Sequence, residues 1–362
     1  MKICFLAPAN NYHTKKWCAY FVGQGHQVTV ISLTDGQIDG TTVYWLNSNT
    51  EATQSDFRKI RYLFQFIKVR RLIHKIKPDV INVHYASSYG TLAALSGLKN
   101  YIVSVWGSDV YEFPKKSFLH RMLLKYSLGS AKYIFSTSKA MAKETRKYTD
   151  KKIYITPFGV DMTLFNPDKR TRLDKTEFVI GTVKRLEPKY GIDYFLRAVK
   201  IVRENRPDIP LKVRIAGKGT HEAEYKRLAE ELGIADIVSW LGFISQQDAA
   251  KEWANMDCAI IFSESESESF GVSAVEAQAA GVPVIISDIP GLMEATDPGV
   301  TSLVVPRKNI RKLADAIIKI YDCPEVGSDM AKKGRYFVSH TYELNQCFHY
   351  IIQLYRYICE GR

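Results

Sequence analysis

The sequence predicts an α/β protein of two domains, each built on a parallel β-sheet, and three observations support this. Short apolar runs of strand length alternate with helix-like segments along the chain. The alternation is interrupted near the middle by residues 156–172, which are rich in proline, glycine and charge, as connections between domains are. A chain of 362 residues, of which 46% are hydrophobic, can also bury two full cores.

The strands of the first sheet are predicted from apolar runs that alternate with helix-like segments, which is the pattern of βαβ units. These runs lie at Ile3–Leu6, Gln27–Ile31, Thr42–Trp45, Val80–Val83, Ile102–Val105 and Tyr133–Ser136. The same alternation resumes beyond the connecting segment, at Phe178–Val183, Lys212–Ala216, Val238–Leu241, Cys258–Phe262, Val284–Ser287 and Ser302–Val305. We therefore expect two successive parallel sheets, with ligand crevices at the carboxyl ends of their strands.

The predicted domains comprise residues 1–165 and 166–340, and residues 341–362 form a separate helical segment. Within that segment, Leu344–Ile358 has apolar residues at helical spacing, which predicts a helix with one buried face. The residues of this face are Cys347, Tyr350, Ile351 and Leu354.

The composition indicates a protein of the reducing cytoplasm. No uninterrupted apolar stretch approaches the 20 or so residues of a spanning helix, and the N-terminus leads directly into a strand rather than a signal peptide. The six cysteines are scattered without C-x-x-C pairs, which argues against a zinc site and against a disulfide framework.

The net charge of +12 is divided unevenly between the two predicted domains. Residues 1–165 contain 23 Lys plus Arg against 10 Asp plus Glu, whereas the rest of the chain contains 27 against 28. The excess positive charge therefore belongs to the N-terminal half. This predicts an anionic partner for that half, which could be a bilayer surface, a phosphate-bearing acceptor or nucleic acid.

Two segments of the N-terminal half, residues 57–77 and 114–126, interleave basic residues with aromatic and aliphatic ones. Basic amphipathic helices suit an anionic membrane surface, where each cation contributes about 1 kcal/mol. The alternative is that Leu63, Ile67 and Ile73 face the sheet while the cations are merely solvated. We expect membrane contact, at the inner face of the cell membrane. No nucleic-acid partner is expected, because no recognised motif for one is present.

The loop after the predicted strand Cys258–Phe262 has the features of a ligand site. A helix is predicted at Ser273–Ala280, ended by Gly281. Backbone amides at such a helix start favour an anionic or hydroxyl-rich ligand, and Gly271 lets the backbone approach it closely.

Two carboxylates, Glu268 and Glu276, flank this turn eight residues apart. Together they could accept hydrogen bonds from several hydroxyls of one molecule, as sugars and ribose require. A nucleotide sugar fits that description. The alternative is that Glu276 is an exposed helix carboxylate and that Glu268 merely complements the helix dipole.

Further segments extend the pattern along the chain: Met1–Pro8, Gly25–Ser32, Thr156–Asp161 with Phe165, Lys184–Gly191, Ala216–Gly219 and Leu241–Gly242. With Glu268–Ala277 and Gly281–Ser287 they resemble, over nearly the whole chain, the retaining nucleotide-sugar-dependent glycosyltransferases of the GT-B class, called glycosyltransferase family 4. The resemblance implies two Rossmann-like, doubly wound domains facing across a cleft. It also implies that the C-terminal helix crosses back to the N-terminal domain.

By the same resemblance, Glu268 lies beside the donor sugar and Glu276 binds the ribose hydroxyls. Backbone amides of Phe270, Gly271 and Val272 would contact sugar hydroxyls or phosphate.

The leaving diphosphate requires positive charge, because negative charge develops there as the glycosidic bond breaks. Arg185 is the first candidate, with a surface ion pair as its alternative. The family usually has a lysine where this chain has Tyr190, so Lys189, one place earlier, and Lys184, where the family has glycine, both remain candidates for the second cation. Gly217 is assigned to donor binding within its glycine turn.

On the acceptor side, the family often carries a His-Gly pair where this chain has Trp106-Gly107. Because tryptophan cannot accept a proton, the histidine role passes to His84 or His13 or is dispensable. For His84, the favoured alternative is a strand-end histidine with satisfied hydrogen bonds. Asp109 could bind an acceptor hydroxyl or cap a local turn.

No Asp-x-Asp occurs in the sequence, so we expect chemistry without a metal or other cofactor. The resemblance implies transfer of a hexose or N-acetylhexosamine from a UDP-linked donor to a lipid-linked or polysaccharide acceptor of bacterial surface glycans. It also implies retention of configuration through front-face attack assisted by the leaving phosphate. The alternatives are a nucleotide-sugar 2-epimerase of GT-B architecture and a non-catalytic basic protein that binds lipid or nucleic acid.

Overall fold

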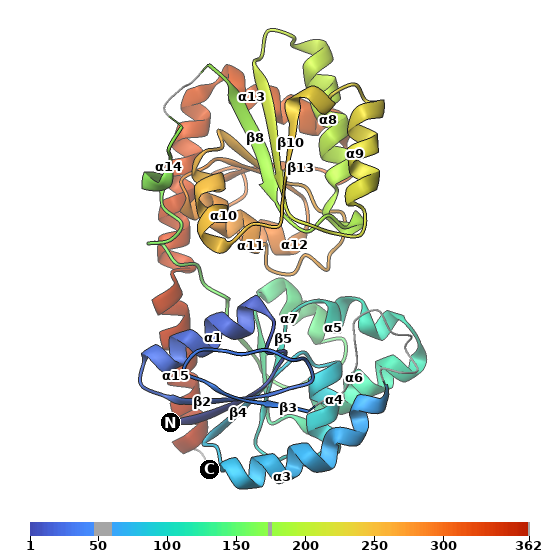
Figure 1. Ribbon diagram of the computed structural model, residues 1–362, viewed down its shortest axis with the longest axis vertical. Coiled ribbons are helices and arrows are strands. Elements are labelled where there is room, and N and C mark those ends of the chain that lie inside the picture. The colour runs from blue at the N-terminus through green and yellow to red at the C-terminus, as the bar shows by residue number, and fades with distance from the viewer. Residues whose placement is uncertain (47–59, 173–175, 361–362) are drawn as a thin grey trace. The chain divides into compact units, whose positions relative to one another are not determined.

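The computed structural model describes residues 1–46, 60–172 and 176–360. It divides the chain into two compact units (Figure 1). The first unit comprises Met1–Phe158 and Cys347–Arg362, and the second comprises Gly159–Gln346. The start of the predicted basic segment, residues 57–59, and the last two residues of the predicted helical segment lie outside the described residues.

The described part of the first unit contains a sheet in the order β3-β2-β1-β4-β5-β6-β7, and all its pairings are parallel. Its strands are β1 (Lys2–Leu6), β2 (Gln27–Ser32), β3 (Thr42–Trp45), β4 (Val80–His84), β5 (Ile102–Val105), β6 (Tyr133–Ser136) and β7 (Ile153–Ile155). Its helices are α1 (Tyr12–Gly23), η1 (Ile60–Gln65), α3 (Phe66–Ile76), α4 (Ser88–Leu95), α5 (Ser108–Tyr111), η2 (Phe113–Lys115), α6 (Phe118–Ser130) and α7 (Lys139–Thr145).

The second unit contains, in its described residues, a parallel sheet in the order β10-β9-β8-β11-β12-β13. Its strands are β8 (Phe178–Val183), β9 (Leu211–Ala216), β10 (Val238–Gly242), β11 (Cys258–Ile261), β12 (Val284–Ser287) and β13 (Ser302–Val305). Its helices are η3 (Pro167–Lys169), η4 (Pro188–Tyr190), α8 (Ile192–Asn205), α9 (Glu222–Glu231), η5 (Ala235–Ile237), α10 (Gln246–Ala254), α11 (Val272–Ala279), α12 (Pro290–Glu294), α13 (Ile310–Asp322) and α14 (Pro324–Thr341).

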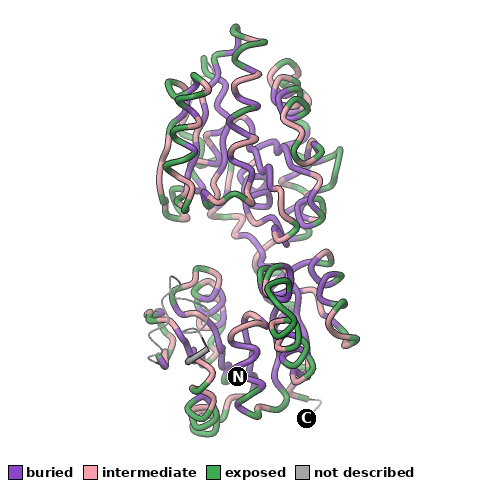
Figure 2. The backbone as a smooth tube through the Cα atoms, turned by 90° about the vertical axis from the view of Figure 1, so that its right-hand side faces the viewer, coloured by how far each residue is buried: buried purple, intermediate pink, exposed green. Residues whose placement is uncertain are grey.

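The predicted strands are present in both sheets. They could be predicted because the central strands are buried along their whole length. Every residue of β4, β5, β11 and β12 is buried, as Figure 2 shows for the interior of each unit. Parallel strands that are covered on both faces are continuous apolar runs in the sequence, which makes them detectable. The strand β7 was not predicted, because it has only three residues and directly precedes Thr156-Pro157.

The last helix, α15 (Leu344–Glu360), begins in the second unit and from Cys347 onward belongs to the first, as predicted. The ring of Phe348 lies 5.3 Å from that of Trp17, and the Nδ2 group of Asn82 donates a 2.6 Å hydrogen bond to the hydroxyl of Tyr355. One residue of the predicted buried face is wrong: Tyr350 is 41% exposed.

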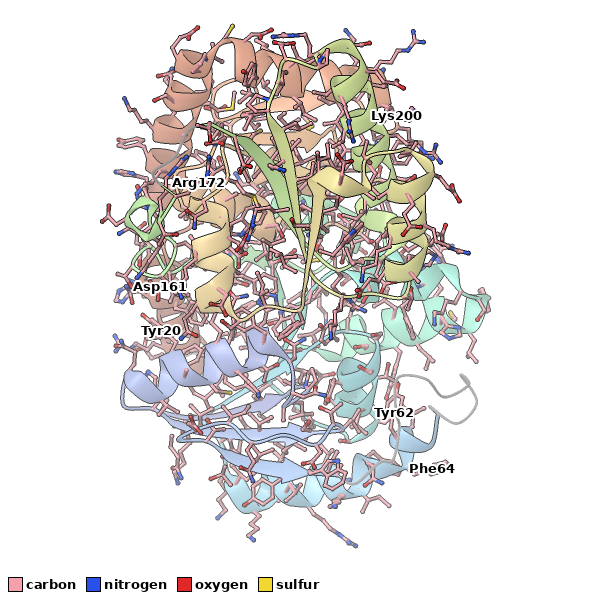
Figure 3. The ribbon with its side chains drawn as sticks, turned by 45° about the horizontal axis from the view of Figure 1, so that its top comes forward. Tyr20, Tyr62, Phe64, Asp161, Arg172 and Lys200 are labelled. Atoms are coloured by element: carbon pink, nitrogen blue, oxygen red, sulfur yellow. The ribbon has the colours of Figure 1, made fainter. Side chains whose placement is uncertain are left out.

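The connecting segment is attached to the second unit from Gly159 onward. The guanidinium groups of Arg170 and Arg172, the latter labelled in Figure 3, both pair with Asp257. The backbone of Val160 bonds on both sides to the junction between α14 and α15. Its N–H donates to Tyr342 at 2.7 Å, and its carbonyl accepts from Leu344 at 2.9 Å. The two places where the chain passes between the units are therefore joined to each other within the second unit.

No helix among the described residues is long and apolar enough to cross a membrane.

Candidate active site

The candidate donor residues lie at the carboxyl ends of β8 and β11, which are adjacent in the sheet of the second unit. From β8 the chain continues to β9 and β10 on one side, whereas from β11 it continues to β12 and β13 on the other. Such a reversal of strand order opens a crevice at the carboxyl ends of the strands, where α/β proteins bind ligands. The loop after β8 carries Lys184 and Arg185, and the loop after β11 carries Glu268.

Glu268 forms a buried ion pair with Lys184. The distance from Lys184 Nζ to Glu268 Oε2 is 2.6 Å, and the two side chains are only 13% and 8% exposed. The ammonium also lies 4.6 Å from the ring of Tyr190. Burial lowers the pKa of Lys184, but the charge of Glu268 and the other acidic groups around it outweigh burial, so the pKa is raised overall. Lys184 is therefore a charged cation held against a carboxylate.

Glu276, in α11, is also buried. The indole Nε1 of Trp253, in α10, donates a 3.4 Å hydrogen bond to its Oε2 atom. Neither alternative for the two glutamates holds: Glu276 is not an exposed helix carboxylate, and the partner of Glu268 is Lys184 rather than the helix dipole alone.

The first turn of α11 is held by close packing against α12 and by a hydrogen bond to the end of β8. Gly271 has a φ of +72°, and a Cβ there would lie 2.9 Å from a methyl group of Leu292. The hydroxyl of Ser273 donates a 2.9 Å hydrogen bond to the carbonyl of Val183, which ties α11 to the end of β8. Because the first N–H groups of a helix have no acceptor within it, the amides around Val272 are suited to a ligand.

Phe270, by contrast, has a structural side chain. It is buried, and its ring meets that of Tyr342 edge to face at 5.2 Å. The backbone of Phe270, rather than its ring, is therefore the part suited to ligand contact.

Gly217 positions the loop after β8. Its φ is +136°, and a Cβ would stand 1.8 Å from the carbonyl oxygen of Lys184, which no side chain could tolerate. The Lys184 N–H also donates to the carbonyl of Ala216 at 2.9 Å. The glycine turn after β9 thus supports the backbone that presents Lys184.

Arg185 points to solvent, with 73% of its side chain exposed, and its Nη2 lies 3.2 Å from Oε1 of Glu187. The same carboxylate accepts a 2.7 Å hydrogen bond from the Thr220 hydroxyl. That hydrogen bond is the main reason why the pKa of Glu187 is lowered. The surface ion pair considered for Arg185 is thus present. Lys189 Nζ lies 5.3 Å from the Tyr190 ring, and the structure pairs Lys184, not Lys189, with Glu268.

In the first unit, His84 ends β4 within a group of aromatic rings. Its ring centroid is 4.1 Å from that of Trp106, 5.0 Å from Trp17 and 5.1 Å from Phe5. Neither ring nitrogen has a hydrogen-bond partner among the described residues. The expectation of a satisfied strand-end histidine is therefore wrong. Burial, followed by the nearby His13, lowers the pKa of His84 well below its usual value, so the imidazole is neutral.

His13 stacks on Phe158, with ring centroids 4.1 Å apart, and lies edge-on to Trp106. Burial, and secondly the charge of Lys16, lower the pKa of His13 to about 3. The structure thus brings His13, His84 and Trp106 together.

Asp109 is buried nearby and accepts hydrogen bonds from the amides of Ala86, Trp106 and Gly107 at 2.8–3.1 Å. Burial raises the pKa of Asp109, and those amides oppose the rise. Of the two roles considered for Asp109, the structure shows the capping of a local turn.

Two family models match the chain. The model described as "Glycosyl transferases group 1" matches residues 166–337, and the model described as "Glycosyl transferase 4-like" matches residues 2–138. The chain belongs to the group 1 glycosyltransferase family. This confirms the resemblance to enzymes of the family 4 type that was inferred from the sequence.

Curated glycosyltransferases match part of the chain. A D-inositol 3-phosphate glycosyltransferase of Pseudarthrobacter chlorophenolicus is 31% identical over 214 residues, which are 56% of this chain and 50% of that protein. A GDP-mannose-dependent monoacylated alpha-(1-6)-phosphatidylinositol monomannoside mannosyltransferase of Corynebacterium glutamicum is 33% identical over 193 residues, 49% of each chain. The chain spans about half the length of the curated relatives it matches.

Solved glycosyltransferase structures match over nearly the whole chain. A sucrose-phosphate synthase from Thermosynechococcus elongatus has a TM-score of 0.84 at 20% identity, over 100% of both chains. Anabaena HepE, in its complex with UDP, has a TM-score of 0.80 at 18% identity, over 98% of this chain and 99% of that one. At such identities the likeness concerns the fold, and it confirms the predicted GT-B class.

Several residues of this glycosyltransferase site were not singled out from the sequence. Tyr190 holds the Lys184 ammonium, Trp253 contacts Glu276, and Gly291 packs against the carbonyl of Glu268. These three residues come from separate segments, and no local sequence signal would have identified them in advance.

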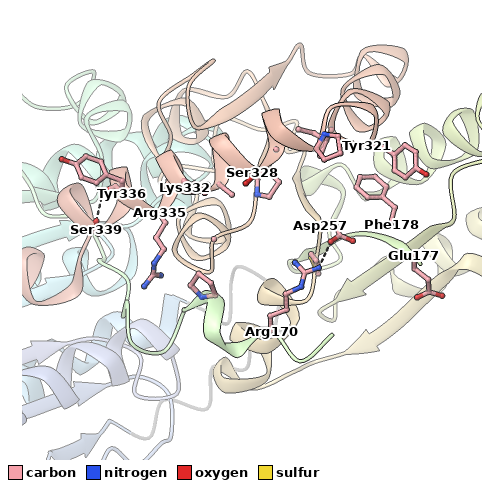
Figure 4. Close-up of a pocket in the computed structure, with 18 of the residues that line it drawn as sticks. Arg170, Glu177, Phe178, Asp257, Tyr321, Ser328, Lys332, Arg335, Tyr336 and Ser339 are labelled. Atoms are coloured by element: carbon pink, nitrogen blue, oxygen red, sulfur yellow. Dashed lines mark hydrogen bonds and ion pairs between the residues drawn. The ribbon is translucent and has the colours of Figure 1, made fainter. Parts of the chain in front are cut away.

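A groove of about 1090 Å³ lies at the opposite, amino-terminal ends of the strands (Figure 4). Phe178 at the start of β8, Asp257 before β11 and Pro283 before β12 line it. This groove is therefore separate from the crevice that holds Glu268, which lies at the carboxyl ends of the strands. Within the described part of the chain, no group of three or more His, Cys, Asp or Glu side chains could hold a metal ion.

Proposed function

We propose that this protein is a retaining glycosyltransferase that transfers a hexose or N-acetylhexosamine from a nucleotide sugar to a lipid-linked or polysaccharide acceptor of bacterial surface glycans. One observation carries the proposal: Glu268, in the loop after β11, and Glu276, in α11, are both buried, and the charged Lys184 after β8 stands against Glu268. Buried carboxylates are costly unless they are paired or hydrogen-bonded. The hydroxyls of a nucleotide sugar would donate hydrogen bonds to the two carboxylates, and its diphosphate would be an anionic partner for Lys184.

The positions of the two carboxylates suggest which part of the donor each one binds. Glu276, oriented by the Trp253 indole, is proposed to accept the ribose hydroxyls. Glu268 is proposed to accept hydroxyls of the donor sugar, near the amides at the start of α11. Lys184 and Arg185 would stabilise the negative charge that develops on the diphosphate as the glycosidic bond breaks.

The reaction is proposed to proceed without a metal or other cofactor and with retention of configuration. The acceptor oxygen would attack the anomeric carbon from the face that the diphosphate leaves. The acceptor proton would pass to a diphosphate oxygen, so that the products are the glycosylated acceptor and the nucleoside diphosphate. UDP is the nucleotide we propose, because HepE binds UDP. GDP is the alternative, because one relative is named as GDP-mannose-dependent.

The acceptor is proposed to be lipid-linked because the first unit carries apolar and basic side chains on η1, α3, α6 and the end of η2. We call the surface that they form the basic apolar patch. Its exposed apolar side chains are Phe64, Ile67, Phe118, Leu119, Met122 and Tyr126, and its exposed cations are Lys68, Arg70, Arg71, Lys115, Lys116, Arg121 and Lys125. Figure 3 labels Phe64 on this surface. Both segments pack on α4, which contacts η1, α3 and α6.

This patch supports membrane contact in two ways. Ile67 is exposed rather than packed against the sheet, which removes part of the purely structural alternative, whereas Leu63 and Ile73 are partly buried. Phe118 is 79% exposed beside several cations, the combination that suits an anionic lipid surface. We propose that the patch holds the enzyme against anionic lipid at the inner face of the membrane.

The donor assignment is tested by thermal shift with UDP-, GDP-, ADP- and dTDP-sugars without added metal, because a ligand that binds only the folded state raises its apparent stability. We expect one nucleotide to give a selective shift that Glu276→Ala abolishes. Donor turnover should fall about 100-fold or more in Glu268→Ala and Arg185→Ala, with the fold retained.

Two outcomes would contradict the proposal. The absence of any shift at saturating donor would remove the nucleotide-sugar site. Conversion of the donor into its 2-epimer without an acceptor would identify the epimerase alternative. Glu204→Gln, an exposed carboxylate on α8, serves as the matched control and should leave turnover unchanged.

A further inference from the structure

The two adjacent cations after β8 are both paired with a glutamate, but their surroundings differ. Arg185 and Glu187 lie 3.2 Å apart, and the arginine is largely exposed. Exposed pairs of this kind contribute little to stability and are easily exchanged. Lys184 and Glu268 lie 2.6 Å apart and are both largely withdrawn from solvent. Breaking this second pair without replacing it would leave a buried charge unpaired, which is strongly unfavourable.

The Lys184 ammonium has more than one favourable neighbour. It lies 2.6 Å from Glu268 and 4.6 Å from the Tyr190 ring, and the charge of Glu276 acts on it as well. An aromatic face attracts a cation without forming a directional bond. The Tyr190 ring therefore allows the ammonium to exchange one anionic partner for another without leaving the loop.

We propose that Glu268 and the diphosphate of the donor compete for the Lys184 ammonium. This inference rests on the proposed function and extends it to how the site responds to its donor. When the diphosphate takes over Lys184, the Glu268 carboxylate becomes available for sugar hydroxyls. Glu268 is thereby turned toward the sugar only when a diphosphate is present, and a free sugar meets a carboxylate that is already occupied.

The exchange is electrically balanced. Lys184 keeps its proton, so no proton is transferred, and the diphosphate brings at least the negative charge that Glu268 ceases to provide. Glu268 in turn gains hydroxyl donors in place of the ammonium. Because charge-assisted hydrogen bonds to phosphate and to carboxylate are of similar strength, a modest difference decides which anion holds Lys184.

The competition predicts that removing the Glu268 charge improves nucleoside diphosphate binding. UDP and GDP would be titrated by calorimetry into the wild type, Lys184→Met, Glu268→Gln and the double variant. For the nucleotide that binds, we expect Lys184→Met to weaken binding by about tenfold or more and Glu268→Gln to strengthen it several-fold. The gain should be absent in the double variant, because it acts through Lys184.

The parent nucleosides, followed by ligand-observed NMR, show whether each variant retains a folded site, since they carry no diphosphate and should bind all four proteins equally. Lys200→Met and Glu204→Gln form the matched control pair. Their side chains lie 3.2 Å apart on the exposed face of α8 (Figure 3 labels Lys200), and neither change should alter binding.

The outcomes separate this inference from the proposed function. If neither UDP nor GDP binds the wild type, both fail. If a nucleoside diphosphate binds but Glu268→Gln leaves its affinity unchanged or weaker, with nucleoside binding intact, only the competition is overturned. An equal gain in the double variant would also overturn it.

A second test leaves both charges in place, for the case that Lys184→Met does not fold. Tyr190→Phe should keep nucleoside diphosphate affinity, because the ring face remains. Tyr190→Leu should lower it several-fold, because the cation–π attraction is lost. Equal affinities in Tyr190→Phe and Tyr190→Leu would contradict the role of the ring.

Discussion

Gly291, the second residue of α12, lies directly against the carbonyl group of Glu268. A Cβ at Gly291 would stand 2.2 Å from that oxygen and 2.8 Å from the carbonyl oxygen of Ser269. Both contacts involve backbone atoms, which cannot rotate away as a flexible side chain would. The loop that presents Glu268 therefore depends on the absence of a side chain in the helix that follows the next strand.

Gly291→Ala should consequently displace the Glu268 loop. We expect a loss of about 1–3 kcal/mol in unfolding free energy, the usual cost of overpacking, together with a marked fall in donor turnover. Denaturant unfolding and donor hydrolysis would measure the two effects. Gly129→Ala is the control: Gly129 lies in α6 with open space around it, so the same change there should stabilise by about 0.5–1 kcal/mol. Unchanged turnover in Gly291→Ala would show that the loop adapts.

Trp253→Phe tests the orientation of Glu276. The substitution keeps an aromatic ring in the core and removes the N–H that donates to Oε2 at 3.4 Å. Because this hydrogen bond is long, we expect donor affinity to fall only a few-fold, corresponding to about 1 kcal/mol.

The matched control for this change is Trp17→Phe in the first unit, where the buried indole nitrogen has no hydrogen-bond partner among the described residues. Calorimetric titration should therefore give wild-type donor affinity for Trp17→Phe. Equal affinities in both variants would mean that the indole does not orient Glu276.

The buried imidazoles of the first unit should make it sensitive to acid. The pKa values of His84 and His13 are lowered in the folded state, so the unfolded chain binds more protons below the ordinary histidine pKa of 6.5. Stability is fully present above pH 6.5 and is lost as the pH falls below it, by at most about 1.4 kcal/mol per pH unit for each group.

His84→Phe should flatten that dependence, because the proton-binding group is removed and a hydrophobic ring suits the aromatic surroundings. Denaturant unfolding at a series of pH values between 7.5 and 5, roughly the range in which histidine titrates, would measure the slope. Equal slopes in the wild type and in His84→Phe would refute the prediction.

If the basic apolar patch contacts the membrane, two exposed apolar side chains at the start of α6 should contribute strongly to vesicle binding. Changing both Phe118 and Leu119 to serine should lower partitioning onto vesicles containing phosphatidylserine by about tenfold or more, since each buried apolar side chain contributes about 1.5–3 kcal/mol. Binding should also weaken as salt is added. Tyr336→Ser, an exposed aromatic on α14 of the second unit, is the control and should bind as the wild type does. Wild-type partitioning of the Phe118/Leu119 double variant would remove the patch as the contact surface.

The strands and the family were predictable because both depend on local sequence. Buried parallel strands appear as apolar runs, and the loop with Glu268 and Glu276 is a contiguous motif. The two predictions that failed, for β7 and for Tyr350, also have physical reasons. Three residues of β7 give too little periodicity to detect. On α15, the larger rings of Phe348 and Tyr355 occupy the interior, so Tyr350 lies on the exposed side.

The partners within the candidate site could not be predicted, because they come from distant parts of the chain. Nothing local indicates that Lys184 rather than Lys189 reaches Glu268, since that depends on how β8 and β11 align. Trp253 and Gly291 contact the site from other helices. The sequence likewise could not show that the ring nitrogens of His84 lack hydrogen-bond partners among the described residues, because the aromatic residues around His84 come from several elements. The roles assigned to these site residues stay predictions.

The hydrogen bonds from Val160 to Tyr342 and Leu344 have a mechanical consequence. The polypeptide leaves the second unit after Gln346 and enters it at Gly159, and these bonds fasten the two strands of chain together near that point. Without these bonds, each of the two connecting segments could move separately. Because they are bonded to each other, a displacement of Tyr342 or Leu344 is passed directly to Val160, and neither crossing can shift within the second unit independently of the other.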